Sequence, residues 1–286
     1  MSVYQVVERQ QRDLLGEGPL WSSRDGAVYW VDILAPALHR LSLIDASLTS
    51  WRMPEMIGWV IGRARAPGFI AGFQSGFAEL TLDPLQIRPI SDPEPHLPTN
   101  RLNDAKADRA GRIWAGSMPV TADIPSGGFY RLNPDHSVVE MDSGYVIANG
   151  PAFSPAQDYL YHTDSGRGVV YRFGLNPDGT LGERIVFLKF EAGWGKPDGM
   201  TVDVDGALWI AHWGAGRVSR FTPDGKVDRV IHLPTSQVTS CAFAGEHLDR
   251  MFVTSAAIDN EQDPLAGALF EINPGIRGLA PGQFAG

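Results

Sequence analysis

The sequence contains one cysteine, Cys241, so no disulfide can form within the chain. That scarcity is typical of proteins from a reducing compartment. No apolar run reaches the roughly 18 residues that a membrane-spanning helix needs, and the first residues lack the apolar core of a secretory signal. These absences predict a soluble cytoplasmic protein. The apolar neighbours of Cys241 predict a buried structural thiol rather than a nucleophile.

Clusters of Lys and Arg are also missing from the sequence. The chain carries 24 basic and 33 acidic side chains, and its formal net charge of −9 is spread along the sequence. Nucleic-acid backbones and anionic membranes attract concentrated positive charge, so neither is an expected partner. A hydrophobic content of 43% supports a substantial core. No linker divides the chain, which predicts a single domain over residues 1–286.

Helical periodicity is scarce, whereas short alternating runs rich in Val, Ile, Tyr, Phe and Trp recur between Gly-, Pro-, Asp- or Asn-containing turns. One pattern occurs four times strongly and twice weakly, at intervals of 40 to 49 residues; its copies begin at Gly16, Met56, Arg101, Ile147, Lys196 and Val238. This period matches the four strands of a propeller blade. The sequence therefore predicts an all-β, six-bladed β-propeller, whose last blade is completed by the N-terminal run at residues 3–8.

One position of the repeat carries a carboxylate or carboxamide in four of the six blades. It lies just before the predicted inner strand, where all six copies approach the central axis at one mouth of the channel. Its occupants are Glu17, Gly58 or Trp59, Asn103, Asn149, Asp198, and Thr239 or Ser240. Asn and Asp are common in turns, but Glu is not. Two acids pointing into a narrow tunnel repel unless a cation lies between them, which predicts a metal site at this mouth.

Hard oxygen donors suit a divalent cation such as Ca²⁺, Mg²⁺ or Mn²⁺, with Zn²⁺ or Fe²⁺ as alternatives. Three ligands, from Glu17, Asn149 and Asp198, would leave coordination positions open for water and substrate, as a catalytic metal requires. The nearby acids Asp203 and Asp205 lack the first acidic position of an EF-hand loop and are interpreted as turn residues.

These segments resemble the regucalcin/gluconolactonase family of sugar lactonases, the senescence marker protein-like proteins, over nearly the whole chain. The likeness is carried by GEGPLW, RLNDAKADRAGRIWAGSM, ANGPAFSP and KPDGMTVDVDGALWIAHW. The resemblance implies a six-bladed propeller with one divalent metal ion held by Glu17, Asn149 and Asp198.

The same resemblance implies residues that contact the substrate. Arg101 and Asn103 of RLND would contact the sugar or the metal-bound water. Asp123, on the loop after GSM, would cover the site, although a solvated loop acid is an equal alternative. The predicted partner is thus a small-molecule sugar lactone.

Ring opening of a lactone requires a polarised carbonyl, an activated water and a stabilised oxyanion. An open-sited metal supplies the first and third, and Asp198 is the predicted catalytic general base. The expected substrate is an aldonolactone of the gluconolactone, xylonolactone or arabinolactone type. The chain has no GxSxG nucleophile motif. His162 and His212 follow strand aromatics and are expected to pack in the propeller wall.

Two alternatives remain open. The propeller could be a non-catalytic calcium-binding or protein-docking platform, because the fold alone does not decide function. A metal-dependent esterase or phosphotriesterase would use the same ion as a Lewis acid. The polar side chains of Arg101, Asn103 and Asp123 favour a hydroxylated substrate over an apolar one.

Overall fold

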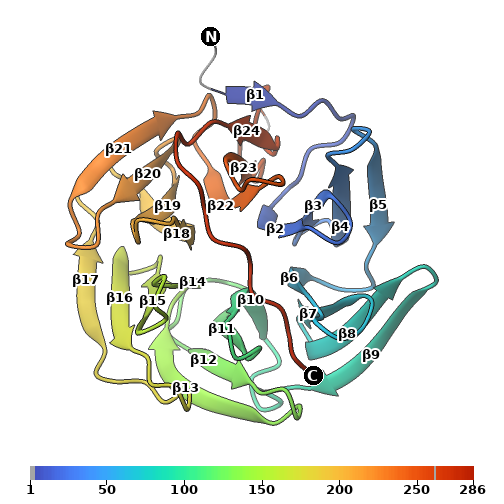
Figure 1. The fold of residues 1–286 in the computed structure, drawn as a ribbon, viewed down its shortest axis with the longest axis vertical. Helices are drawn as coiled ribbons and strands as arrows, with labels where there is room; N and C mark the ends of the chain where they lie inside the picture. The colour runs from blue at the N-terminus through green and yellow to red at the C-terminus, as the bar shows by residue number, and fades with distance from the viewer. Residues whose placement is uncertain (1–3, 261) are drawn as a thin grey trace.

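The computed structural model describes residues 4–260 and 262–286. They form six four-stranded antiparallel sheets arranged around a central axis (Figure 1). The all-β, six-bladed propeller predicted from the repeat is therefore confirmed. Within the described ranges, the structure has no helix with the length and apolar character needed to cross a bilayer.

Two strands of each blade lie nearest the axis. The innermost strands are β2 (Gly16–Ser22), β6 (Ile57–Gly62), β10 (Asn100–Ala107), β14 (Ala148–Phe153), β18 (Lys196–Val202) and β22 (Val238–Ala244). The second strands are β3 (Ala27–Asp32), β7 (Phe69–Phe73), β11 (Ile113–Pro119), β15 (Tyr159–Asp164), β19 (Leu208–Trp213) and β23 (Arg250–Ser255).

In the first five blades the third and fourth strands follow the first two in chain order. In the sixth blade the outermost strand is the N-terminal strand β1. The third strands are β4 (Ala37–Ser42), β8 (Gly76–Leu82), β12 (Gly127–Leu132), β16 (Val169–Gly174), β20 (Arg217–Phe221) and β24 (Phe270–Ile272). The outermost strands are β5 (Leu48–Arg52), β9 (Leu85–Ser91), β13 (Val138–Tyr145), β17 (Ile185–Lys189), β21 (Val227–His232) and β1 (Tyr4–Val6).

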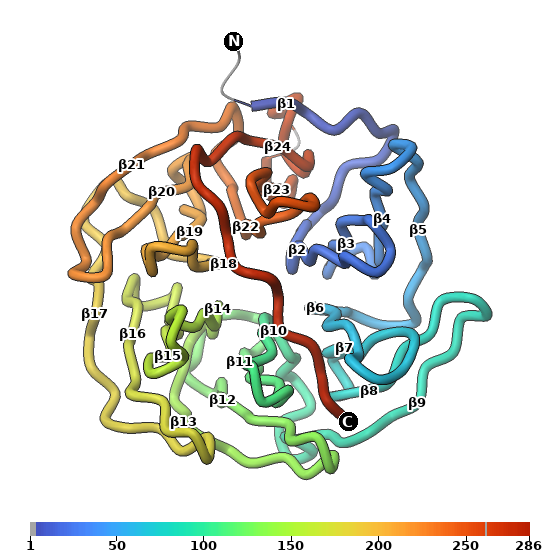
Figure 2. Tube along the Cα trace, in the orientation of Figure 1, coloured from blue at the N-terminus to red at the C-terminus, as the bar shows by residue number. Residues whose placement is uncertain are grey.

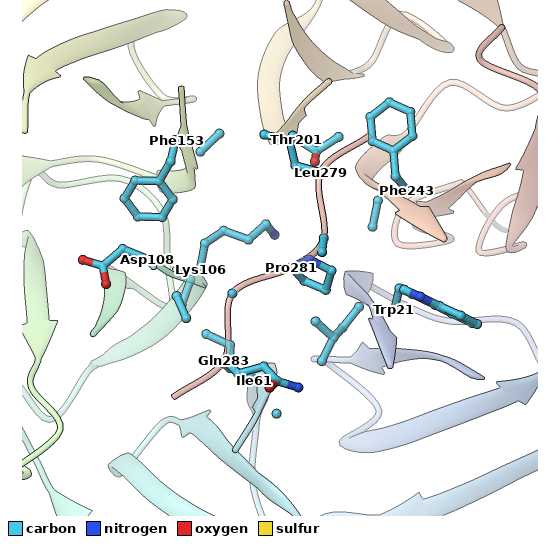
Figure 3. Close-up of a pocket in the computed structure, with 18 of the residues that line it drawn as sticks. Trp21, Ile61, Lys106, Asp108, Phe153, Thr201, Phe243, Leu279, Pro281 and Gln283 are labelled. Atoms are coloured by element: carbon cyan, nitrogen blue, oxygen red, sulfur yellow. The ribbon is translucent and has the colours of Figure 1, made fainter. Parts of the chain in front are cut away.

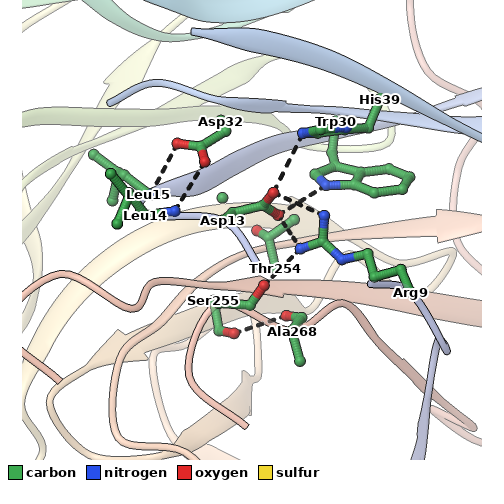
Figure 4. Close-up of polar contacts among 12 residues, drawn as sticks. Arg9, Asp13, Leu14, Leu15, Trp30, Asp32, His39, Thr254, Ser255 and Ala268 are labelled. Carbon is green, nitrogen blue, oxygen red and sulfur yellow. Dashed lines mark hydrogen bonds and ion pairs between the residues drawn. The ribbon is translucent and has the colours of Figure 1, made fainter. Parts of the chain in front are cut away.

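Strand β1 completes the last blade by pairing with β24, with Val6 opposite Phe270. The predicted recruitment of the N-terminal run is confirmed for these residues, whereas Val3 lies outside the described residues. Asp13 reinforces the same seam (Figure 4). Its carboxylate accepts hydrogen bonds from the Trp30 indole at 2.9 Å and from Arg9 at 2.8 Å, and its backbone N–H donates to Gly267 at 3.0 Å. The first and sixth blades are thus joined by strand pairing and by a buried ion pair.

The core consists of six apolar clusters, one between each pair of neighbouring blades. Each cluster buries the faces of two sheets, which is why the strand residues are apolar on both sides. Asp203 supports one of these interfaces. Its carboxylate accepts from the backbone N–H groups of Asp205 and Ala207, and from the indole of Trp209 at 2.9 Å. The interpretation of Asp203 as a turn residue is confirmed, and the same carboxylate also orients a buried tryptophan.

The C-terminal strap, defined here as residues 277–286, crosses one mouth of the channel (Figure 2). At one end the backbone N–H of Gly278 donates to Leu248 of the sixth blade at 2.8 Å. At the other end the N–H of Phe284 donates to Gly62 of the second blade at 2.9 Å. The Phe284 ring is fully buried in the cluster between the second and third blades. Since the Ala285 N–H also donates to Gly111 of the third blade at 3.1 Å, the strap links the third and sixth blades, which lie on opposite sides of the axis.

Candidate active site

In every blade, the pairing register between the innermost and second strands is interrupted at the repeat position identified from the sequence. A bulge leaves residues unpaired and re-aims their side chains. The prediction placed these residues just before the inner strands, and that detail is wrong, because all of them lie within the strands. We call the six positions the ring; they are Glu17, Gly58, Asn103, Asn149, Asp198 and Thr239.

Neighbouring innermost strands approach very closely at the ring. A Cβ atom on Gly58 would lie 2.6 Å from the Asn103 carbonyl oxygen, and one on Gly199 would lie 2.1 Å from the Ser240 hydroxyl oxygen. Contacts this short exclude any side chain at either position. The second blade therefore contributes no ligand to the ring. Trp59, the alternative considered there, is instead buried between the second and third blades.

A hydrogen-bond chain joins three of the predicted site residues. Arg101 donates from Nη1 to the Asn103 side-chain oxygen at 2.5 Å. Asn103 donates from Nδ2 to the Asn149 side-chain oxygen at 2.9 Å, and Asn149 donates to the Ser165 hydroxyl at 2.9 Å. All of these side chains are buried. The structure thus brings Arg101, Asn103 and Asn149 together as a fixed polar network across the third and fourth blades.

The two predicted acids are buried in the same region. Glu17 is 4% exposed and Asp198 is 6% exposed. Burial raises the pKa of Glu17 to about 8, and the charge of Asp104 adds to the rise. Burial also raises the pKa of Asp198 well above its usual value, with further contributions from the Glu17 and Asp104 charges. The repulsion that the sequence predicted between Glu17 and Asp198 is therefore present.

The donor chemistry of the ring fits a hard divalent cation. Oδ1 of Asp198 is buried without a hydrogen-bond partner, which leaves a carboxylate oxygen free to coordinate. Glu17 supplies a second carboxylate and Asn149 a neutral amide oxygen. Among the described residues, however, no three His, Cys, Asp or Glu side chains gather as a metal-binding group. The predicted metal site at the channel mouth is thus compatible with the residues present but is not shown by the structure.

Asp104 is a third buried acid that the sequence analysis missed. It is 1% exposed, and its Oδ2 atom has no hydrogen-bond partner. Burial raises its pKa. The repeat does contain a signal for this residue. A glycine directly follows Glu17, Asn149 and Asp198, whereas an aspartate directly follows Asn103. The third blade therefore brings an extra carboxylate to the ring.

Asp123 lies apart from the ring residues in the contacts that the structure shows. It is exposed on the loop between β11 and β12. In the described part of the chain, its side chain hydrogen-bonds only to Thr121 of the same loop. Its predicted contact with the substrate stays a prediction.

Two histidines and the cysteine are packing residues, as expected from the sequence. His162 is fully buried and stacks on Phe129 with ring centroids 3.9 Å apart; burial lowers its pKa to about 3. His212 is also fully buried and packs against Phe190. Burial raises the pKa of the Cys241 thiol to about 12. A thiol with so high a pKa is a poor nucleophile.

A cavity of about 800 Å³ occupies the channel between the ring and the strap (Figure 3). Its walls include residues that follow the ring along the innermost strands, such as Gly18, Ala105 and Met200. Leu279 and Pro281 of the strap form its other boundary, and the Lys106 side chain extends into it. The strap therefore spans the channel on this side of the ring.

Known proteins resemble this chain over nearly its whole length. Residues 15–257 match the family described as SMP-30/Gluconolactonase/LRE-like region. A 6-deoxy-6-sulfogluconolactonase from Pseudomonas putida is 35% identical over 97% of each chain. An L-arabinolactonase from Azospirillum brasilense is 36% identical over 96% of this chain and 93% of its own. The solved structure of a calcium-binding protein, regucalcin, from Agrobacterium tumefaciens has a TM-score of 0.92 at 27% identity, covering 99% of this chain and 97% of that one.

Proposed function

Since the chain belongs to the SMP-30/gluconolactonase/LRE-like family, we propose that it is a cytoplasmic hydrolase that opens the ring of a sugar lactone and depends on one divalent metal ion. The burial of two carboxylates, Glu17 and Asp198, and of the Asn149 amide at equivalent positions of the repeat carries the proposal. Relatives named for a sulfogluconolactone and for L-arabinolactone support this substrate class. The regucalcin from Agrobacterium tumefaciens, a calcium-binding protein, supports a divalent ion such as Ca²⁺.

Glu17, Asn149 and Asp198 would hold the ion. When bound, it would supply Lewis-acid polarisation of the lactone carbonyl. Asp198 has the additional role of general base, because a carboxylate beside the ion would also lie beside the attacking water and could accept its proton. A carboxylate whose pKa is raised by burial accepts that proton more readily than an exposed one.

Arg101 and Asn103 would orient the hydroxyl groups of the sugar. Burial lowers the pKa of Arg101 to about 10, which still leaves the guanidinium charged at neutral pH. Its hydrogen bond to Asn103 fixes both side chains before substrate arrives. Asp123 would approach the bound sugar from the loop after β11. This polar surround favours a hydroxylated lactone over an apolar ester or a phosphotriester.

The test is hydrolysis of a panel of aldonolactones, pentose and hexose, by wild type and by Asp198→Asn. Each protein is measured after chelation and after restoration with single metal ions. We expect chelation to abolish turnover, and we expect the substitution to lower kcat by about 10² or more, because a positioned base contributes that much.

The matched control is Asp205→Asn, which makes the same chemical change seven residues later on an exposed turn. Its kcat should equal that of wild type. Full activity of the chelated protein would exclude the metal-dependent mechanism. Tight metal binding without hydrolysis of any lactone in the panel would instead support a calcium-binding platform.

A further inference from the structure

Lys106 approaches the ring from the cavity side. It lies in β10, three residues after Asn103, and its side chain is 23% exposed. Figure 3 shows the side chain extending into the cavity toward the strap. Its Nζ atom is 3.9 Å from Oδ1 of Asp104. The ammonium group therefore lies on the side of the ring that faces the strap.

Asp104 connects this ammonium group to the ring. Its Oδ1 also accepts a hydrogen bond from the backbone N–H of Ala105 at 2.7 Å. The negative charge of Asp104 acts on both Glu17 and Asp198. A buried carboxylate with one unpartnered oxygen is costly unless a positive charge lies nearby. Lys106 is the charge that the fold provides.

The charge balance of the site depends on this lysine. When fully ionised, the carboxylates of Glu17, Asp104 and Asp198 oppose the cations Arg101 and Lys106, which gives a formal charge of −1. A divalent ion changes it to +1. That remaining positive charge would balance the single negative charge that develops on a lactone carbonyl oxygen during attack by water. Without Lys106 the loaded site would be neutral.

We propose that Lys106 is a built-in counter-cation of the ring, which compensates Asp104 and thereby weakens the binding of a divalent cation by Glu17 and Asp198. Lys106 is thus a positioning residue that acts through Asp104. The inference rests on the proposed divalent-ion site but does not require that the substrate be a lactone.

The experiment measures the Kd of Ca²⁺ and of Mn²⁺ by titration calorimetry on chelator-treated protein at fixed pH and ionic strength. Lys106→Met removes the charge and should lower the Kd by about tenfold or more, because charges interact strongly in a poorly hydrated channel. Asp104→Asn should raise the Kd by a similar factor. Opposite changes from neighbouring substitutions separate an electrostatic role from general damage to the fold.

Two controls complete the design. Lys106→Arg keeps the charge and should retain the wild-type Kd within about threefold, and Lys226→Met removes a lysine whose side chain is 81% exposed and should change nothing. An unchanged or raised Kd in Lys106→Met would overturn the proposal. If Lys106→Met does not fold, the Kd of Asp104→Asn is the deciding measurement. A Kd that is not higher than that of wild type would then overturn the proposal.

The wild-type titration separates this inference from the proposed function. If wild type binds neither ion, the metal-dependent function fails. In that case binding by Lys106→Met alone would still support a lysine that excludes cations, and no binding by either protein would overturn both. If wild type binds an ion and Lys106→Met binds it equally well, only the inference fails.

Discussion

Three buried acids, two in the ring and one next to it, are held in a state that folding alone does not favour. Glu17, Asp104 and Asp198 are each buried, and the pKa of each is raised first by that burial. The hydrogen bonds that reach them come mainly from backbone N–H groups, and two of their oxygens have no partner. Buried acids of this kind destabilise an ion-free protein when they ionise, and a cation bound by Glu17 and Asp198 would reduce that cost.

This cost predicts how stability changes with pH in chelated protein. The pKa of Glu17 is about 8 in the folded chain against an ordinary 4.5, so the folded state holds a proton that the unfolded state releases. The contribution of Glu17 to stability is therefore complete below pH 4.5 and is lost as the pH rises through 8. We expect the Tm of chelated wild type to fall by at least about 5 °C between pH 5 and pH 8.

Glu17→Gln should flatten this part of the pH profile, because glutamine does not ionise. Adding Ca²⁺ should raise the Tm of wild type at pH 8 and raise that of the variant much less. The exposed Glu183→Gln serves as the control and should follow wild type. Equal slopes for Glu17→Gln and wild type would show that Glu17 is not the group that titrates.

At the scale of strands, the ring depends on bulges at which neighbouring blades nearly touch. Gly199 follows Asp198 directly and faces Ser240 of the next blade at a distance that allows no Cβ atom. Adding a methyl group there would push β18 away from β22. Because Asp198 is carried on β18, the position of its carboxylate depends on this contact.

Gly199→Ala should therefore destabilise the protein by roughly 2 kcal/mol, as overpacking does elsewhere, and should also weaken Ca²⁺ binding. Gly174→Ala is the matched control, since a Cβ atom at that position of β16 meets nothing within 4 Å. Combining Gly199→Ala with Ser240→Gly should recover part of the stability, because the two closest clashing atoms, the Ser240 hydroxyl oxygen and Cβ, are removed. Additive losses in the double variant would contradict this account. Urea denaturation measures all four proteins.

The same bulges explain how much the sequence could predict. The repeat predicted the blades because alternation and turn residues are local properties of each strand. It also predicted the ring, since equivalent positions of a repeat converge in space. Its error was to place Glu17 and Asn149 before their strands. Both are followed by Gly and Pro, which read as a turn although the structure uses them in a bulge within the strand.

The sequence pattern could not predict features that depend on side-chain direction at a bulge or on contacts between distant segments. The pairing of Lys106 with Asp104 follows from the directions of two side chains of β10, one within the bulge and one after it. The path of the strap follows from backbone hydrogen bonds to four different blades. Neither leaves a periodic signal, because irregular segments lack the alternation that identifies a strand.

For the molecule as a whole, closure of the circle is reinforced in three places. Strand β1 pairs with β24, the Asp13 network joins the first and sixth blades, and the strap crosses the channel. The strap differs from the other two because it connects blades that share no interface. The cavity separates it from the ring, so its role in stability can be tested separately from activity.

Phe284→Ala tests the strap. Loss of this fully buried ring should lower the free energy of unfolding by about 3 kcal/mol. Hydrogen exchange should localise the effect, because the Ala64 N–H donates to the Phe284 carbonyl at 2.8 Å and the Ala285 N–H donates to Gly111 at 3.1 Å. Both amides should lose protection while amides of the innermost strands keep theirs.

The Ca²⁺ affinity and kcat of Phe284→Ala should stay within about twofold of wild type, since the substitution leaves the ring itself untouched. Ile44→Ala, at a side chain that is 82% exposed, controls for loss of apolar volume and should cost little stability. Unchanged protection of Ala64 together with an unchanged free energy of unfolding would mean that the strap does not brace the propeller. A large loss of Ca²⁺ affinity would mean instead that blade spacing at the ring depends on the strap, because Phe284 packs in the same cluster as Trp59 and Leu102, which directly adjoin ring positions.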